Sequence, residues 1–323
     1  MSEKSMQFAN FNITYSNMDK NGKNENIPML RYFKEIILPA FKQDYSLKTS
    51  SNNAVYMFND VQIENINDEY CVAGNFIKST AYEVNTQYEN NHIIPVNSVV
   101  PTAPYSRFII FLKNHRMVLV KNEKLSPDIR SFQRTYRSAI NHFISVHNKN
   151  VEKHERFPNA IVNIVDIPLM EDIKAVLKDV KKIHYVKLRF FPLNNDIDFT
   201  VAYNDVRDLM NFAVSNSANL VLNSPKSKNS ICELLNENAG LVEPSAKVTK
   251  DSGEYTSIKP SSFTSSTSVH LKDNIEPQDD KKIFSVAKSK SALSKTSAAN
   301  QKLYDDCLKN IEKLYNQKED DSD

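Results

Sequence analysis

Glycine is scarce and scattered in this chain, and this constrains its fold and chemistry more than any other feature. The sequence holds four glycines, Gly22, Gly74, Gly240 and Gly253, and no two of them lie within ten residues of each other. The dinucleotide-binding fingerprint and the phosphate-binding loop of nucleotide hydrolases both need closely spaced glycines, because their backbones approach phosphates directly. The sequence therefore argues against both of these nucleotide-binding motifs, and we expect no cofactor.

The length and apolar content of the chain favour two domains and a tail. A chain of 323 residues with 40% hydrophobic residues can bury a sizeable core. The strand and helix patterns predict an α+β protein with mixed or antiparallel sheets and flanking helices. We predict an N-terminal α+β domain at 1–150, a second α+β domain at 151–260, a flexible Ser/Thr/Lys-rich segment at 261–300, and a C-terminal helix with an acidic tail at 301–323.

Several local patterns in the first half of the chain are clear. Residues 8–15 alternate apolar and polar side chains, which predicts a strand with one buried face. The apolar runs RFIIFL and MVLV flank KNHR and predict an antiparallel hairpin with Lys113 and Arg116 at its tip. The proline-rich stretch 93–104 before this hairpin resists helix formation and is expected to be a connection.

The helix that follows this hairpin is the best-defined element of the sequence. Ser126 is expected to cap it, Pro127 to occupy its first turn, and the helix to end near Val146. Apolar side chains recur at helical spacing and predict a core-facing stripe. The members of this stripe are Ile129, Phe132, Tyr136, Ile140 and Phe143.

Three arginines on the outer side of this helix form the strongest candidate site. Residues 107–156 hold eleven Lys or Arg against four Asp or Glu, whereas the whole chain carries a net charge of only +2. Arg130, Arg134 and Arg137 lack the acidic partners that accompany a merely solvated helix face. We expect them to contact the phosphates of a nucleic acid, with duplex DNA favoured over RNA. Four further cations would extend this surface if the hairpin packs beside the helix: Lys113, Arg116, Lys121 and Lys124.

Two other functions stay open. A metal-dependent nuclease would need carboxylates at strand ends, and the basic helix face would equally suit an adaptor that binds an acidic protein. The candidate carboxylates are Asp166, Asp196, Asp198, Asp205 and Asp208. Because no established catalytic motif is present, we assign no catalytic residue and favour a role that is not enzymatic.

Histidine spacing does not predict a metal site. His142, His147 and His154 are separated by five and seven residues, which places them on different faces of a helix. A zinc site needs three ligands that converge on one point. We therefore expect no bound metal.

Compartment and assembly are predicted from simple patterns. The N-terminus lacks the apolar core of a signal peptide and no run of about 18 apolar residues occurs, so we expect a soluble, cytoplasmic protein with reduced, buried cysteines. The apolar stripe at 304–315 needs a surface to pack on. Its own domain is favoured over a second copy, although we expect the protein to act as a homodimer.

Residues 101–140 carry a resemblance to a known group of proteins. A proline-rich lead-in, an apolar strand, a basic turn with a histidine, a second strand and a helix that opens with Leu-Ser-Pro follow one another in PTAPYSRFIIFLKNHRMVLVKNEKLSPDIRSFQRTYRSAI. This block resembles the RexA-like bacterial proteins of phage exclusion and abortive infection. The resemblance implies an intracellular sensor or DNA-binding component of anti-phage defence that acts with a membrane effector. It transfers no catalytic residues.

Overall fold

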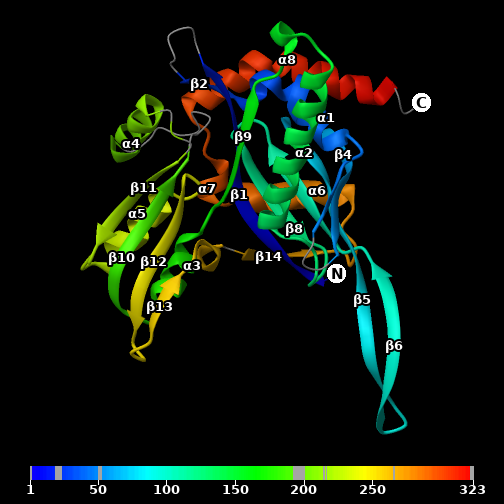
Figure 1. Cartoon of the computed structure of the whole chain (residues 1–323), viewed down its shortest axis with the longest axis vertical. Coiled ribbons are helices and arrows are strands. Elements are labelled where there is room, and N and C mark those ends of the chain that lie inside the picture. The colour runs from blue at the N-terminus through cyan, green and yellow to red at the C-terminus, as the bar shows by residue number, and fades with distance from the viewer. Residues whose placement is uncertain are drawn as a thin grey trace.

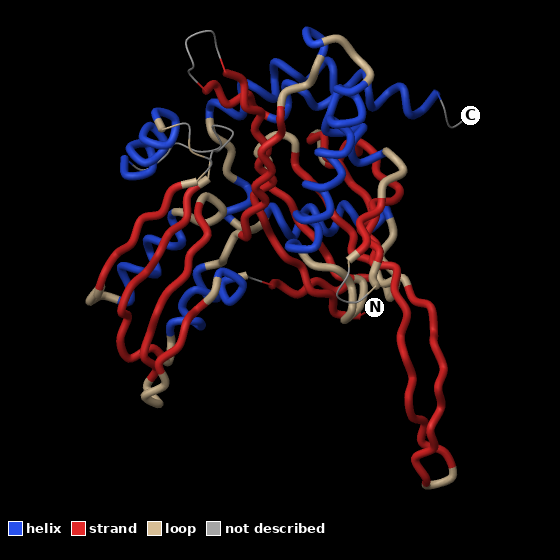
Figure 2. The backbone as a smooth tube through the Cα atoms, in the orientation of Figure 1, coloured by secondary structure: helices blue, strands red, loops and turns tan. Residues whose placement is uncertain are grey.

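The protein is an α+β molecule with two antiparallel sheets, as the sequence predicts (Figures 1 and 2). The computed structural model describes residues 2–18, 24–49, 53–191, 201–213, 215, 217–264 and 266–320. None of the described helices is both long enough and apolar enough to cross a membrane. The three cysteines are free and buried, in agreement with the prediction of reduced thiols.

The large sheet is assembled around one long N-terminal strand, β1. Along the sheet the strands are β14 (Ser266–Leu271), β1 (Ser2–Met18), β8 (Arg116–Lys121), β7 (Tyr105–Phe111), β5 (Glu69–Glu89), β4 (Val55–Ile66) and β3 (Ser46–Lys48). Three further strands pair off this path: β2 (Asn24–Pro28) and β9 (Asn159–Asp166) with β1, and β6 (His92–Thr102) with β5. The predicted hairpin is β7–β8, in which Phe111 pairs with Arg116.

Both faces of β1 are buried, which corrects the prediction of one buried face. Phe11, Ile13 and Tyr15 enter the core on one face, as the alternation predicts. The polar side chains of Asn10, Asn12 and Thr14 are nevertheless fully buried as well. The loop at Gly240 covers this second face, where the amide of Asn10 donates a hydrogen bond of 3.0 Å to the Gly240 carbonyl. Asn10 Oδ1 and Thr14 Oγ1 are buried here without a hydrogen bond from the described residues, so polar character along a strand does not by itself mark a solvent-exposed face.

Helices on the first face enclose an aromatic core. They are η1 (Met29–Tyr32), the π-helical η2 (Phe33–Ile37), α1 (Leu38–Lys42), α2 (Ile129–Lys149) and α8 (Ala298–Asp320). The ring of Phe132 lies 5.0–5.3 Å from the rings of Phe58, Phe76 and Phe108. The predicted stripe of α2 is confirmed, with Phe143 half-buried against Phe157.

The start of α2 differs from the prediction. Its N-cap is Asp128, whose carboxylate accepts a hydrogen bond of 2.9 Å from the Ser131 backbone N–H. The hydroxyl of Ser126 instead accepts a hydrogen bond from the Glu123 N–H and so fixes the preceding loop. Both Ser and Asp are good N-cap residues, so the sequence offers two candidates for one position.

The second face of the large sheet is covered by the segment that we expected to be flexible. Residues 261–300 begin within η4 (Pro260–Phe263) and then contain β14, η5 (Pro277–Asp279), α6 (Asp280–Lys288) and α7 (Ser291–Ser294). Ile283, Phe284 and Leu293 are buried against β7 and β8. Few but regularly spaced apolar residues order this segment, and the abundance of Ser, Thr and Lys concealed them.

The small sheet contains β11 (Ala218–Asn223), β10 (Val180–Phe190), β12 (Val242–Lys250) and β13 (Tyr255–Ile258), in that order. With it lie α3 (Met170–Leu177), α4 (Val201–Phe212) and α5 (Lys228–Glu237), while η3 (Lys153–Glu155) precedes β9. Although residues 151–260 were assigned to a second domain, β9 pairs with β1 of the large sheet. The strand, helix, strand unit β9–α3–β10 therefore bridges the two sheets.

Strands β5 and β6 form an arm that projects from the body of the molecule (Figure 1). The proline-rich stretch 93–104, expected to be a connection, supplies most of β6. Proline cannot donate a ladder hydrogen bond and is confined to edge strands, and β6 pairs with β5 alone. Tyr82, Tyr88 and Ile93 are exposed on this arm.

The C-terminal helix packs on its own chain. Tyr304, Cys307 and Ile311 of α8 are buried in the first-face core. The Tyr70 backbone N–H donates a hydrogen bond of 3.0 Å to the Tyr304 hydroxyl. This stripe is therefore not available for pairing between two copies, and homodimer formation stays a prediction that rests on other surfaces.

Candidate nucleic-acid interface

Arg130, Arg134 and Arg137 lie on the exposed side of α2, as predicted. The residues Phe132, Thr135 and Tyr136 between them are buried, so one side of the helix faces the core and the other faces solvent. Arg130 is in the first turn, where unpaired backbone N–H groups give the helix end a partial positive charge. Among the described residues, none of the three arginines forms an ion pair with a carboxylate within 4.0 Å.

Arg137 contacts strand β9. Its Nη2 donates a hydrogen bond of 2.6 Å to the Val162 carbonyl oxygen. One edge of β9 pairs with β1. The contact with Arg137 covers part of the other edge of β9 and discourages pairing of that edge with another strand. A guanidinium has five N–H donors, so one structural contact leaves others for a ligand.

Helix α2 and strand β9 line a groove, which we call the α2–β9 groove. Ile129, Arg130 and Gln133 stand opposite residues 164–166 at one end, and Asn141, Ser145 and Lys149 stand opposite residues 159–160 at the other. The contact between Arg137 and Val162 divides it into two clefts of about 410 Å³ and 760 Å³. At about 1.5 Å of rise per residue, the helical side is roughly 29 Å long between Arg130 and Lys149.

Five exposed cations accompany the α2–β9 groove: Arg130, Lys149 and Arg156 line its clefts, Arg137 lies between the clefts, and Arg134 lies between Arg130 and Arg137 on the exposed side of α2. Lys149 and Arg156 border the larger cleft and were not selected from the sequence, although both belong to the positively charged stretch 107–156. Helical spacing could have found Lys149, because Arg130, Arg134, Arg137, Asn141, Ser145 and Lys149 recur every three or four residues. Arg156 follows the end of α2, so helical spacing gives no signal for it.

The hairpin cations do not join this surface as a group. Arg116 is buried with Val118 and Val120 on the sheet face that α6 and α7 cover, whereas α2 lies on the opposite face. The expectation that Arg116 contacts phosphates is therefore wrong, because side chains along a strand alternate between its two faces.

The remaining hairpin cations lie at two separate ends. Lys113 is half-buried at the tip, where the amide of Asn114 donates hydrogen bonds of 2.8 Å and 3.1 Å to the carbonyls of Leu293 and Lys295. Lys121 is half-buried at the far end of β8, and Lys124 is exposed in the loop that leads into α2. Lys124 is thus the hairpin cation that best fits an extension of the groove surface.

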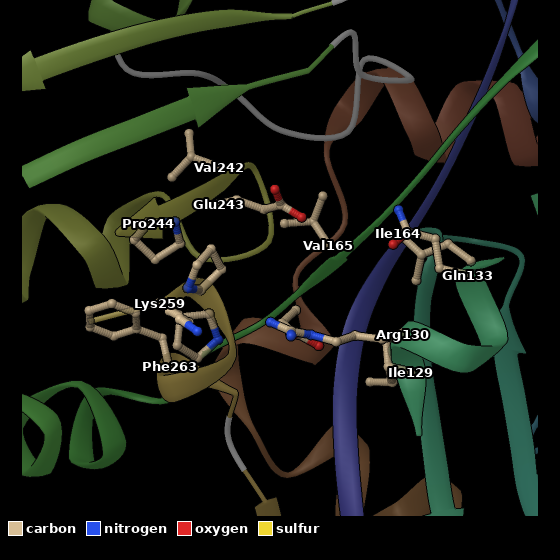
Figure 3. Close-up of a pocket in the computed structure, with 13 residues that line it drawn as sticks. Ile129, Arg130, Gln133, Ile164, Val165, Val242, Glu243, Pro244, Lys259 and Phe263 are labelled. Carbon is tan, nitrogen blue, oxygen red and sulfur yellow. The ribbon is translucent and has the colours of Figure 1, made fainter. Parts of the chain in front are cut away.

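The smaller cleft lies between the two sheets and brings together charges that are distant in the sequence (Figure 3). Arg130 enters it from α2, Asp166 from β9, and Glu243 from β12. Lys259 lies beside η4, and Glu243 also contacts Arg189 at 3.9 Å. Sequence reasoning missed Glu243 and Lys259, because only the packing of the two sheets brings them to α2.

Asp166 is the most perturbed acid in this cleft. Burial raises the pKa of its carboxyl, while a hydrogen bond of 2.7 Å from the Thr264 hydroxyl to Oδ2 and the nearby charge of Arg130 lower it. The other oxygen, Oδ1, is buried and accepts no hydrogen bond from any residue that the structure describes. The Asp166 carboxylate is thus held through one oxygen and enclosed by the protein at the other.

The candidate nuclease carboxylates that the structure describes are not gathered around Asp166. Asp205 and Asp208 are exposed on α4, and Asp196 and Asp198 lie outside the described residues. His142 contacts Gln43, and His147 stacks on Phe157 with ring centroids 3.8 Å apart. Within the described ranges, no group of three or more His, Cys, Asp or Glu side chains is arranged to hold a metal ion.

Comparison of the sequence with protein-family models and with curated proteins finds no match.

Proposed function

We propose that this protein binds nucleic acid, with DNA the expected ligand, through the α2–β9 groove. The observation that carries the proposal is the row of five exposed cations along one groove, none of which forms an ion pair with a described carboxylate. A groove roughly 29 Å long is lined on one side by α2. Several phosphates of one backbone can meet these cations at once, and each contact releases counterions from the nucleic acid.

The test is binding of a fluorescent 20-base-pair duplex by the full-length protein across a salt series. Replacing Arg130, Arg134 and Arg137 together by glutamine should weaken binding and lower the slope of log K against log salt by about 2.7, since each phosphate contact contributes about 0.9. Circular dichroism confirms that the variant is folded.

A matched control separates groove contacts from net charge. Lys302, Lys309 and Lys313 are exposed on α8, so replacing them by glutamine removes the same charge from another helix. The control variant should keep most of the affinity and the slope. Equal losses in both variants, or no loss in the arginine variant, would refute the assignment of the groove.

The same mixtures distinguish binding from cleavage. Intact DNA and RNA after incubation with Mg²⁺ support a binding protein, whereas Mg²⁺-dependent products would favour the nuclease function.

We further propose that this binding serves bacterial anti-phage defence, together with a membrane effector. The support is the resemblance of residues 101–140 to RexA-like proteins, which covers the strands β7 and β8 and the first half of α2. Phage plating efficiency on bacteria that express the protein, compared with the triple arginine variant, tests this role. Equal plating efficiency on the two strains would show that the α2–β9 groove has no part in defence.

A further inference from the structure

The small sheet, at the left of Figure 1, has one covered face and one open face. On the covered face, Ile173 and Leu177 of α3 and Leu235 of α5 pack with Val186 and Val248 in one apolar cluster. Side chains along a strand alternate between the two faces of a sheet. Buried and half-buried residues accordingly alternate along β12, and the residues between the buried ones form what we call the open face.

The strands of the small sheet are strongly basic. Together they hold six Lys or Arg and one acid, Glu243. Lys187, Arg189 and Lys247 belong to the open face, because each lies between two buried residues of its strand. Oε2 of Glu243 lies 3.9 Å from Nη1 of Arg189. Lys187 and Lys247 form no ion pair with a described carboxylate, so the open face keeps positive charge for an anionic ligand.

Two tyrosines stand among these cations. The exposed fractions of Tyr185 and Tyr255 are 38% and 61%. Nζ of Lys247 lies 4.5 Å from the ring centroid of Tyr255, and the His184 ring meets the same ring edge-on with centroids 5.0 Å apart. A β-bulge at this point of β10 turns His184 to the open face, where its Nε2 lies 2.8 Å from Oγ1 of Thr249. The open face thus offers aromatic rings and cations side by side.

The spacing of the two tyrosines suits two bases of one strand. Tyr185 pairs with Lys247 of β12, and Lys247 in turn pairs with Ser257 of β13, two residues from Tyr255. Strands about 4.8 Å apart, with a rise of about 3.4 Å per residue, place the Cα atoms of Tyr185 and Tyr255 roughly 12 Å apart. Lys247 lies between them. A nucleic-acid backbone that crosses Lys247 can therefore place one base on each ring.

We propose that the open face binds single-stranded nucleic acid, with bases stacked on Tyr185 and Tyr255 and phosphates on Lys187 and Lys247. Single strands present the faces of their bases, which stack on aromatic side chains, whereas the bases of a duplex stack on one another. An acidic protein would match the lysines but would leave the exposed rings without a partner. Every base has a π face, so this site needs no particular base sequence.

The open face leads into the α2–β9 groove. Glu243 contacts Arg189 on the open face and also lines the smaller cleft together with Arg130. A nucleic acid with a duplex part and a single-stranded part can therefore contact both surfaces. The inference goes beyond the function proposed above, because it depends only on residues of the small sheet.

The test is fluorescence anisotropy of the full-length protein with a labelled 12-nucleotide strand, as DNA and as RNA, and with the DNA duplex of the same sequence. Tyr185→Ala with Tyr255→Ala should weaken single-strand binding at least about fivefold, because stacking of one base contributes at least that factor. Duplex binding should be unchanged. Tyr185→Phe with Tyr255→Phe keeps both rings and should bind like the wild type. The strand that binds more tightly, DNA or RNA, identifies the preferred ligand.

A matched control removes two exposed rings from another surface. Tyr82→Ala with Tyr88→Ala changes the arm and should leave single-strand affinity unchanged. Lys187→Gln with Lys247→Gln tests the phosphate contacts and should lower the slope of log K against log salt by about 1.4 for the single strand. If circular dichroism shows that the alanine variant is unfolded, this lysine variant decides, and an unchanged slope overturns the proposal.

Two results with the folded alanine variant would also overturn the proposal. One is single-strand affinity equal to that of the wild type, and the other is an equal loss of single-strand and duplex affinity. The triple arginine variant keeps failure of the two proposals apart, because it should weaken duplex binding and retain single-strand binding. Single-strand binding that the arginine variant loses and the tyrosine variant keeps would place the strand on the α2–β9 groove instead.

Discussion

The ion pair between Arg107 and Asp280 is the contact whose removal should most disturb the fold. Arg107 projects from β7 and is fully buried, and Asp280 begins α6 with 4% of its side chain exposed. Arg107 donates two hydrogen bonds to the carboxylate, from Nε at 3.0 Å and from Nη2 at 2.6 Å. A third, from Nη1 to Asn75, measures 3.3 Å. This fork holds the segment 261–300 against the large sheet.

Removing one partner should cost far more than removing both. Asp280→Leu removes the buried carboxylate from Arg107 and leaves the guanidinium with Asn75 and, 3.9 Å from Nη1, the half-exposed carboxylate of Asp60. The free energy of unfolding should fall by about 3–5 kcal/mol. Placing a charge in the core is itself costly, and burial accordingly raises the pKa of Asp280 despite the hydrogen bonds from Arg107. The double variant Arg107→Met with Asp280→Leu should therefore recover most of the loss and approach the wild type in stability.

Urea denaturation of the four proteins, followed by circular dichroism, completes this double-mutant cycle. The exposed pair Lys250 and Glu254 is the control, because Glu254→Gln should cost less than about 1 kcal/mol. Additive losses in the double variant, without recovery, would mean that the two side chains stabilise the protein independently and that the reasoning about the pair is wrong.

Three further predictions concern the cleft, the core and the arm. Burial raises the folded-state pKa of Asp166, so the folded protein binds more protons than the unfolded chain, and stability should fall as the pH rises above about 4. Asp166→Asn should reduce the dependence of the unfolding free energy on pH, measured by urea titrations at several pH values. An unchanged dependence would contradict the prediction. Gly74→Ala places a Cβ 2.8 Å from Val61 and 2.9 Å from Phe108, which should lower the free energy of unfolding by about 1–3 kcal/mol; a neutral result would show that both side chains can move aside. Replacing residues 82–100 by Asn-Gly removes an exposed arm and should change the unfolding free energy by less than about 1 kcal/mol, whereas a larger loss would show that the arm stabilises the body.

Local periodicity predicts much of the first half of the fold. The hairpin β7–β8 and the stripe of α2 follow from residues that are close in sequence. The position of Arg116 does not, because it depends on which elements cover each face of the sheet. One signal was present: RFIIFL and MVLV are continuous apolar runs, and such runs are typical of strands buried on both faces.

The smaller cleft could not be predicted from local sequence patterns. Asp166, Glu243 and Lys259 are separated by many residues and belong to two sheets and a turn. Each alone is indistinguishable from a surface charge. These three side chains lie close together because β9, which was predicted to belong to the second domain, pairs with β1 of the large sheet. The periodicity of the sequence does not predict this long-range pairing.

The position of β1 has a consequence for how the protein is made. This strand leaves the ribosome before the other described strands, yet Ser2 to Gln7 pair with β14 at residues 266–271. At about 5–20 residues per second, synthesis of the intervening chain takes roughly 13–50 s. The small sheet, which ends at Ile258, can complete its own strands before that moment. The nascent N-terminal strand therefore waits with an open edge, and release of chains shortened before residue 266 would leave that edge unpaired and prone to aggregation.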